Sequence, residues 1–483
     1  MTNRNQKSLM KNVFVLVFAL ATTFGFAQKK WTLRECVDYA LENNISVQQS
    51  ELDVELSEIG KKDALGNFMP SLNASGSHSW NIGLNQNITT GLLENLTTQF
   101  TSVGVNSNVT IYNGLRNINT LHRSNIEILA NQYQLDKMKD DIALRVANAY
   151  LQILFNKEQL KVFQGQNALT KDNINRTQEL IDAGVIPSGD ILELNATDAT
   201  QAQQIIAAEN NLFLSKISLA QLLQIKDYQN FDIAEEDYEL ISEDILNEDI
   251  SLIISKAKER LNNIRIAETN KDLAEINVKL AKGAYYPTLS GFYSYSTRAS
   301  YNDRVVGGEL NSENPTSVIG TVEGTGESVV APNFSPIIGG PENLFDQFSR
   351  NDGHNFGLQL NIPIFNGFAT RNNISRNKVA LERSKYLLEQ SNLDVESTIY
   401  QAYNDTKNAK QSYEAALKTA EARKQAYEYL QERYNIGASN SFDFNQSKIQ
   451  YENSQAEVVR TKYDYIFKLK ILEFYFGLPI ANN

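Results

Sequence analysis

The residues that most often carry out chemistry in proteins are scarce in this 483-residue sequence. Its single cysteine is Cys36 and its three histidines are His78, His122 and His354, which leave little for a disulfide framework, a zinc site or thiol catalysis. The sequence has no phosphate-binding loop of the GxxxxGK[ST] type. Carboxylates are scattered over segments with a helical pattern and form no pair beside a nucleophile. The sequence therefore predicts a protein that is not an enzyme and that uses no cofactor or metal.

Two segments share a glycine followed six residues later by an aspartate: Gly184 with Asp190, and Gly437 with Asp443. Glycine readily adopts the left-handed conformation that ends a helix. An aspartate at the start of the next helix can accept from its free N–H groups and favour its positive end. Both segments are therefore predicted to be turns between two helices, and a purely structural role of the aspartates as caps is one of two open alternatives.

These two turns belong to a long internal repeat. Gly114 matches Gly367 and Gly184 matches Gly437, both at an offset of 253 (367 − 114 and 437 − 184). Upstream the offset is 217, as for Gly66 and Gly283 (283 − 66). The difference of 36 residues (253 − 217) predicts an insertion in the second copy. A repeat of this length changes the expected fold, and it predicts a tandem duplication.

Each copy is predicted to have the order helix, strand, strand, very long helix, helix, and the long helix would reach about 105 Å. The first helix has a capping-box pattern at Thr32 and Glu35. The first repeat, residues 28–247, is predicted to contain a helix at 31–66, strands at 70–85 and 100–112, a long helix at 114–182 and a helix at 190–225. The second, residues 248–483, is predicted to contain a helix at 249–283, strands at 287–301 and 354–365, a long helix at 367–435, a helix at 443–476 and a long surface loop at 303–352.

Residues 1–27 have the pattern of a cleaved secretory signal peptide. A cationic start precedes an apolar stretch from Val13 to Leu20, and Gly25-Phe26-Ala27 fits a cleavage site. A membrane anchor is the alternative, but the apolar stretch is short. Net charge of −12 argues against a nucleic-acid partner, which requires basic surfaces.

The strands alternate apolar residues with small polar ones. A soluble sandwich would bury the apolar side, whereas an outer-membrane barrel would turn it to lipid and place aromatic residues such as Trp80, Phe292, Tyr293 and Tyr295 near the interfaces. Four strands are too few to close a barrel. Lipid tolerates no open strand edge, so the barrel interpretation requires several copies of the chain.

The helices also allow two interpretations. A soluble coiled coil would need sustained heptads, but small and polar residues are frequent on these helices. Two-sided packing in a curved wall of long and paired short helices suits that composition better.

Taken together, the signal peptide, the duplicated helix–strand–strand–helix–helix unit and the paired Gly-x5-Asp turns resemble the TolC-like outer-membrane efflux proteins over about residues 31–478. The resemblance implies an α+β membrane protein. Three chains would share one 12-stranded β-barrel standing on a long periplasmic α-helical barrel. It also implies a passive exit duct for small molecules, drugs or polypeptides, located in the outer membrane of a Gram-negative bacterium. Its partners would be outer-membrane lipid, a periplasmic adaptor and an inner-membrane pump.

The resemblance places a periplasmic gate and adaptor-docking tips at the two turns. The family's gate pairs the first aspartate with a tyrosine and an arginine of the second turn. Here the tyrosine is present and serine replaces the arginine, so a weaker gate is expected; the tyrosine could equally be a packing residue and the aspartates simple caps. The implied gate positions are Asp190, Tyr434, Ser439, Asp443 and Gln446, and the implied docking positions are Gly184, Pro187, Ser188, Gly437 and Ser441.

A non-channel stalk with coiled coils and a β-head remains the alternative to the duct. The four methionines and three histidines give no support for a metal cargo. The role of 303–352, as a plug, a shield or a recognition loop, stays open.

Overall fold

The computed structural model describes residues 30–86, 91–235 and 243–478, so the predicted signal peptide lies outside the described residues. The chain divides into two compact units. The helical unit comprises residues up to 58, 126–273 and 381 onward, and the sheet unit comprises residues 59–125 and 274–380. Each unit takes segments from both predicted repeats. No helix among the described residues is long and apolar enough to cross a membrane.

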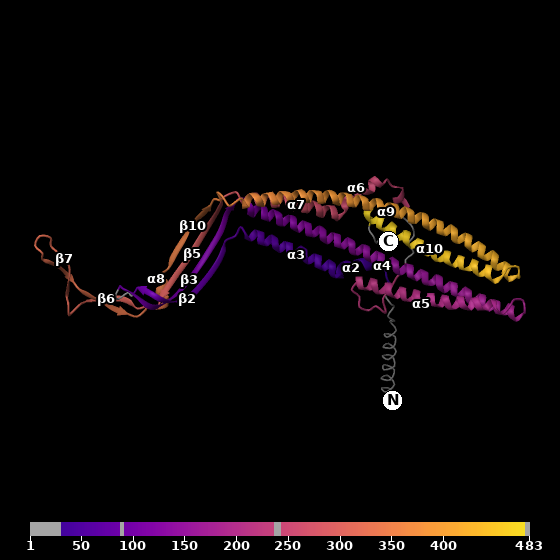
Figure 1. Cartoon of the computed structure of the whole chain (residues 1–483), viewed down its shortest axis with the longest axis horizontal. Coiled ribbons are helices and arrows are strands. Elements are labelled where there is room, and N and C mark those ends of the chain that lie inside the picture. Colours follow the sequence, from indigo (N-terminus) through magenta and orange to yellow (C-terminus); the bar gives the residue numbers. More distant parts are fainter. Residues whose placement is uncertain (1–29, 87–90, 236–242, 479–483) are drawn as a thin grey trace, which may run out of the picture. The chain divides into compact units, whose positions relative to one another are not determined.

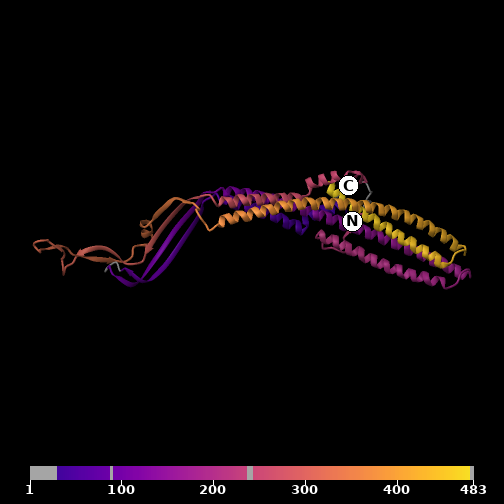
Figure 2. The same ribbon diagram turned by 45° about the horizontal axis from the view of Figure 1, so that its top comes forward.

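Two helical hairpins dominate the helical unit. In the first, α4 (Arg116–Asp182) is followed by α5 (Asp190–Leu222), and in the second, α9 (Ala369–Asn435) is followed by α10 (Ser441–Phe476). Figures 1 and 2 show the two helices of each hairpin lying side by side. Both long helices contain 67 residues, or about 100 Å at 1.5 Å per residue.

The helices predicted at 31–66 and 249–283 are each broken in two, which corrects the sequence prediction. The first becomes α2 (Leu33–Asn43) and α3 (Ile45–Gly66), and the second becomes α6 (Ile250–Arg260) and α7 (Asn262–Gly283). The breaks fall at Asn44 and Leu261, which are 217 residues apart and have the same extended backbone (φ −68°, ψ 128° and φ −65°, ψ 124°).

Tertiary hydrogen bonds explain the break at Asn44. The Asn44 side chain accepts from the N–H of Ser46 at 2.9 Å and donates to the carbonyl of Leu222 at 3.0 Å. A side chain that serves as cap and as cross-link favours the extended conformation over continued helix. The capping box at Thr32 and Glu35 is confirmed, because each residue's side chain bonds to the other's backbone N–H.

A two-stranded parallel pair, β1 (Lys30–Trp31) with β4 (Asp232–Ile233), closes the core of this unit beside α4. The Tyr150 hydroxyl, on a fully buried side chain, donates to the carbonyl of Ala234 at 2.7 Å. Asp232 forms ion pairs of 2.9 Å with both Lys157 and Lys216. Burial raises the pKa of the Asp232 carboxyl, but the two lysines outweigh it and hold the pKa below its ordinary value of 3.8.

Asp232→Asn is expected to destabilise the helical unit by about 2 kcal/mol, because two partly buried ammonium groups lose their 2.9 Å ion pairs and Lys157 keeps only the longer pair with Glu235, at 3.7 Å. With a lowered pKa in the folded protein, the wild-type carboxylate contributes stability at pH values above 3.8, and that contribution is lost as pH falls through the folded pKa. Thermal unfolding at pH 7 and pH 3 should therefore show a large difference between variant and wild type at pH 7 that shrinks at pH 3. Asp38→Asn, at an exposed pair, is the control. An equal effect of both variants would contradict this account.

The sheet unit contains an antiparallel four-stranded sheet in the order β10-β5-β3-β2. Its strands are β2 (Ser71–Gln86), β3 (Leu93–Asn113), β5 (Thr288–Ser300) and β10 (Gly353–Asn361). The predicted strands are thus present with shifted ends, and β3 begins seven residues earlier than expected (100 − 93).

The register of this sheet separates an apolar face from a polar face. One row of paired residues across all four strands is Phe356, Tyr293, Ser107 and Leu72, and the adjacent row on the other side is Asn355, Ser294, Asn106 and Asn73. The apolar face is exposed, with exposed fractions of 75% for Leu72 and 76% for Phe356. The other large exposed side chains of this face on the two outer strands are Trp80, Ile82, Leu84, Leu358 and Leu360.

The segment predicted as a long loop at 303–352 instead contains four strands and a helix, which corrects that prediction. Strand β6 (Arg304–Leu310) pairs with β9 (Phe334–Gly339), and β7 (Thr316–Thr321) pairs with β8 (Ser328–Pro332). Short runs of valine and isoleucine within the glycine-rich composition explain the ladders. The helix α8 (Leu344–Arg350) packs on β5, where Gln347 bonds to both backbone groups of Ser300.

Candidate functional site

Both hairpin tips have the same backbone geometry. Gly184 and Gly437 each have φ +72°, and each ends its long helix in a Schellman motif. In the first tip the N–H of Val185 donates to the carbonyl of Leu180 at 2.9 Å, and in the second the N–H of Ala438 donates to Arg433 at 2.8 Å. The predicted left-handed glycines are therefore confirmed.

The alternative in which the two aspartates are N-caps is wrong. Asp190 is the first residue of α5, whose N-cap Gly189 has no side chain to offer. At the second tip the cap is Asn440, whose side chain accepts from the N–H of Asp443 at 2.8 Å. Both aspartates lie in a first helical turn, where their charge favours the helix dipole. Asp190 is half-buried and Asp443 is exposed, so both carboxylates can interact with other groups.

Tyr434 lies in an aromatic cluster between α9 and α10. Its ring stacks on Phe444 with centroids 4.8 Å apart and planes 6° apart, and Tyr427 stacks on Phe444 and Tyr451. Burial raises the pKa of the Tyr434 hydroxyl, a hydrogen bond with Thr177 of α4 opposes this, and the charge of Asp190 raises it further. The structure thus brings Tyr434 and Asp190 within electrostatic range of each other and gives Tyr434 a packing role as well.

The remaining predicted gate residues lie in the second turn and on α10. Ser439 is half-buried in the second turn and Gln446 is exposed on α10. The guanidinium nearest the second turn in sequence is Arg433, whose Nη2 donates to the carbonyl of Ala438 at 2.9 Å. Its charge favours the C-terminal end of α9, and its hydrogen bond holds the turn, a role that the residue type at position 439 does not reveal.

The predicted docking positions Pro187 and Ser188 are exposed, and Ser441 is half-buried at the start of α10. Beside them are large apolar side chains that sequence reasoning passed over: Val185, Ile436 and Phe442, with exposed fractions of 60%, 79% and 73%. Apolar residues flanking a turn glycine were the available signal. They give the two tips apolar ends of the kind that partner proteins cover.

Tyr434→Phe should leave the packing of the tip nearly unchanged, because the stacked ring remains, whereas Tyr434→Ala removes a buried ring and should cost about 3–5 kcal/mol. Hydrogen exchange of the backbone amides of residues 427–451 measures the local effect. Tyr429→Ala, at a ring that is 60% exposed, is the matched control and should cost little. Similar exchange in the two alanine variants would show that the cluster does not hold the tip.

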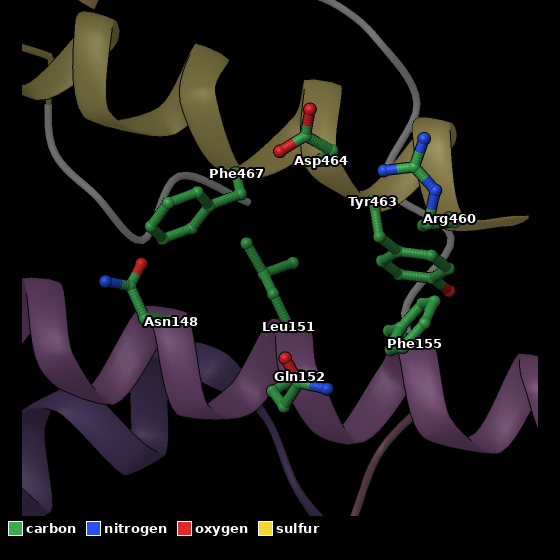
Figure 3. Close-up of a pocket in the computed structure, with 8 residues that line it drawn as sticks. All are labelled: Asn148, Leu151, Gln152, Phe155, Arg460, Tyr463, Asp464 and Phe467. Carbon is green, nitrogen blue, oxygen red and sulfur yellow. The ribbon is translucent and has the colours of Figure 1, made fainter. Parts of the chain in front are cut away.

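Farther from the tips, α4 and α10 border a groove of about 350 Å³. Figure 3 shows Leu151 and Phe155 of α4 directed toward α10, with Tyr463 beside Phe155 and Asp464 near Arg460. Four aromatic or aliphatic side chains and four polar or charged ones, among them Asn148 and Gln152, line this groove. Within the described ranges, no group of three or more histidine, cysteine or acidic side chains is placed to hold a metal ion.

Comparison with known proteins connects this geometry to a family. The sequence model of the family described as "Outer membrane efflux protein" matches residues 36–223 and 253–477. The outer membrane protein TolC of Vibrio cholerae serotype O1 is 21% identical over 335 residues, which are 68% of this chain and 66% of that protein. Protein CyaE of Bordetella pertussis is 23% identical over 396 residues, 80% of this chain and 71% of that protein.

Among solved structures, the outer membrane protein VceC of Vibrio cholerae has the same fold. It superposes with a TM-score of 0.72 at 14% identity and covers 93% of this chain and 97% of its own.

Proposed function

The chain belongs to the outer membrane efflux protein family, and from that premise we propose that three copies of it form the exit duct of a tripartite export system. The match of the family model to both halves of the chain carries this assignment. The protein is accordingly an efflux channel protein of the outer membrane. The number of copies, the gate and the partners are proposals beyond the family assignment, and contacts and exposed side chains of the chain support them.

The exposed apolar face of the sheet supports a lipid-facing position. A soluble sandwich would cover Leu72, Ile82 and Phe356, yet each is more than 70% exposed within the sheet unit. The opposite face presents serine and asparagine, as a wet lumen requires. This pattern favours the duct over the soluble stalk.

Strand pairing supports assembly of three copies. Strands β2 and β10 form the two outer edges of the four-stranded sheet. In lipid an open edge leaves backbone groups without hydrogen-bond partners. Three sheets of four strands joined edge to edge give twelve strands, above the minimum of about eight for a barrel of this kind.

The glycines at the base of the sheet support the same assembly. A Cβ on Gly114 would overlap the carbonyl oxygen of Gly283, so these two glycines meet closely within one chain. Their repeat equivalents, Gly367 and Gly66, have open space where a Cβ would stand. If neighbouring copies repeat the same junction, Gly367 of one copy meets Gly66 of the next.

The hairpin tips are proposed as the periplasmic gate and the docking site for an adaptor, which links the duct to an inner-membrane pump. The proximity of Asp190 to Tyr434 and the exposed Val185, Ile436 and Phe442 support this. Without an arginine at Ser439 and an acid at Gln446, the gate is proposed to be weak. Small molecules, drugs or polypeptides are the proposed cargo.

We also propose that residues 28–247 and 248–483 are the two copies of a tandem duplication. The equal lengths of α4 and α9 and the equivalent breaks at Asn44 and Leu261 support a duplication.

Native mass spectrometry of the detergent-extracted protein tests the assembly. We expect a single species with three times the mass of the mature chain. A monomer that is stable without detergent would contradict the duct and favour the stalk.

A further inference from the structure

Four side chains form a closed polar ring between the two helical hairpins. The Lys448 ammonium of α10 donates to the hydroxyl of Thr170 of α4, which lies 2.6 Å from Oε1 of Gln201 of α5. The Gln201 amide donates to Glu452 at 3.1 Å, and Glu452 forms an ion pair with Lys448 at 3.6 Å. The ring therefore joins three helices, two from the first hairpin and one from the second.

This ring is largely withdrawn from water. Thr170, Gln201 and Lys448 are exposed by 0%, 4% and 3%, and the Glu452 side chain by 12%. Burial lowers the pKa of Lys448 and raises that of Glu452, and each charge opposes the shift of the other. The other charged group facing Lys448 is Asp198 of α5, which is held at 2.7 Å by the Asn167 amide.

Contacts along α4 and α10 show that these helices run antiparallel in one register through the ring. The Phe155 and Tyr463 side chains lie beside each other in Figure 3, and their ring centroids are 6.0 Å apart. Fifteen residues further along α4 is Thr170, and fifteen residues back along α10 is its partner Lys448 (170 − 155 and 463 − 448). Between them, Gln166 donates to Gln455 at 3.3 Å.

The ring has no equivalent in the other half of the duplication. At the offset of 253, Lys448 and Glu452 correspond to Asn195 and Ala199, which cannot form an ion pair. Thr170 and Gln201 correspond to Arg423 and Ser454. Since α4 resembles α9 and α5 resembles α10, an apolar contact alone would distinguish poorly between the two hairpins. The residues that form the charged ring are present in one half of the duplication and are replaced in the other.

A buried ion pair adds little net stability, because desolvation of the two charges offsets their attraction. Buried polar groups are retained in some helical assemblies because they fix partner and register. We propose that the ring of Lys448, Glu452, Thr170 and Gln201 is a pairing key that selects α10 as the neighbour of α4 and α5 and sets its axial register. If the tips gate the duct, as proposed above, the key also sets the level at which Tyr434 meets Asp190.

The test measures register by disulfide trapping in a Cys36→Ala background, since Cys36 is the only cysteine. Phe155→Cys is combined with Tyr463→Cys for the observed register, and with Val459→Cys or Phe467→Cys for shifts of one turn either way. Each cysteine pair is introduced into the protein with the wild-type ring and into the apolar triple variant Lys448→Met/Glu452→Leu/Gln201→Leu. The triple variant removes all three partners of Thr170 in the ring, and the Thr170 hydroxyl keeps its hydrogen bond to the carbonyl of Gln166. Disulfide yield is measured in detergent-extracted protein together with thermal unfolding.

With the ring intact, we expect the observed-register pair to give about tenfold more disulfide than either shifted pair. In the triple variant the yields should become comparable while the thermal midpoint is unchanged or higher. Lys448→Met alone should lower the midpoint, because it leaves Glu452 buried without its partner. A triple variant that keeps the tenfold preference would overturn the proposal, and so would one that fails to fold, which would make the ring a stabilising device. The trapping needs no channel assay, so a wild-type protein with the expected preference but no conductance would contradict the proposed function alone.

Discussion

Alanine at Gly114 will prevent the chain from reaching its folded state. Gly114 has φ +69°, which costs a residue with a side chain about 1–2 kcal/mol. Its Cβ would also overlap the backbone carbonyl of Gly283 and lie 2.8 Å from the Cβ of Tyr286. Backbone atoms cannot move aside as a flexible side chain can, so the total cost should exceed about 3 kcal/mol.

The measurement is the yield of folded protein in the outer-membrane fraction, with circular dichroism of whatever is recovered. Gly60→Ala is the control, because its Cβ would have open space in the middle of α3, where alanine favours helix over glycine. Gly60→Ala should be neutral or stabilising. Recovery of Gly114→Ala at the wild-type level would contradict the close junction between Gly114 and Gly283.

Alanine at Gly367 will allow the chain to fold but block the closure of the three-copy assembly. Gly367 has φ +60° and open space around its Cβ, so within one chain the cost is about 1–2 kcal/mol of backbone strain. In the proposed assembly this added Cβ would overlap Gly66 of the next copy. A Cβ on Gly114 would overlap Gly283 within one chain in the same way. The penalty then occurs at all three contacts of the ring.

Circular dichroism measures the helical content and native mass spectrometry measures the mass of the assembly, so together they distinguish a defect in folding from a defect in assembly. Gly367→Ala should retain the helical signal and lose most of the trimer, whereas Gly114→Ala should lose both. Gly326→Ala, at φ +73° and also with open space where its Cβ would stand, controls for backbone strain without a contact to another copy. A stable trimer of Gly367→Ala would show that the copies do not repeat the junction seen within the chain.

The sequence pattern predicted the repeat, the long helices and the strands because those features are local and periodic. It could not show that Asn44 breaks the first helix, since the acceptor of the Asn44 side chain lies 178 residues away at Leu222. Apolar periodicity continues through the break, so the pattern alone indicates one helix. The apolar pattern also continues through the equivalent break at Leu261, so it did not reveal that break either.

At the tips, the left-handed glycines followed from sequence because few other residues adopt that conformation. Spacing left open whether the aspartates are caps, and it did not point to Asn440, three residues before Asp443, which is the N-cap of α10. The stack of Tyr434 on Phe444 joins residues across a turn, and a list of motif positions does not reveal it. The segment 303–352 is rich in glycine and acidic residues, and this composition predicted a loop. Its short runs of valine and isoleucine nevertheless pair as strands.

The most direct test of the central claim is single-channel conductance of the purified, detergent-extracted protein in a planar bilayer. Wild type is compared with Asp190→Ala/Tyr434→Phe, which removes the charge and the hydroxyl of the proposed gate and keeps the ring that stacks on Phe444. The account predicts discrete openings of one size, with a higher open probability in the double variant. Protein that is shown to be folded but never inserts or conducts would contradict the duct. Openings that the double variant leaves unchanged would remove the gate from Asp190 and Tyr434.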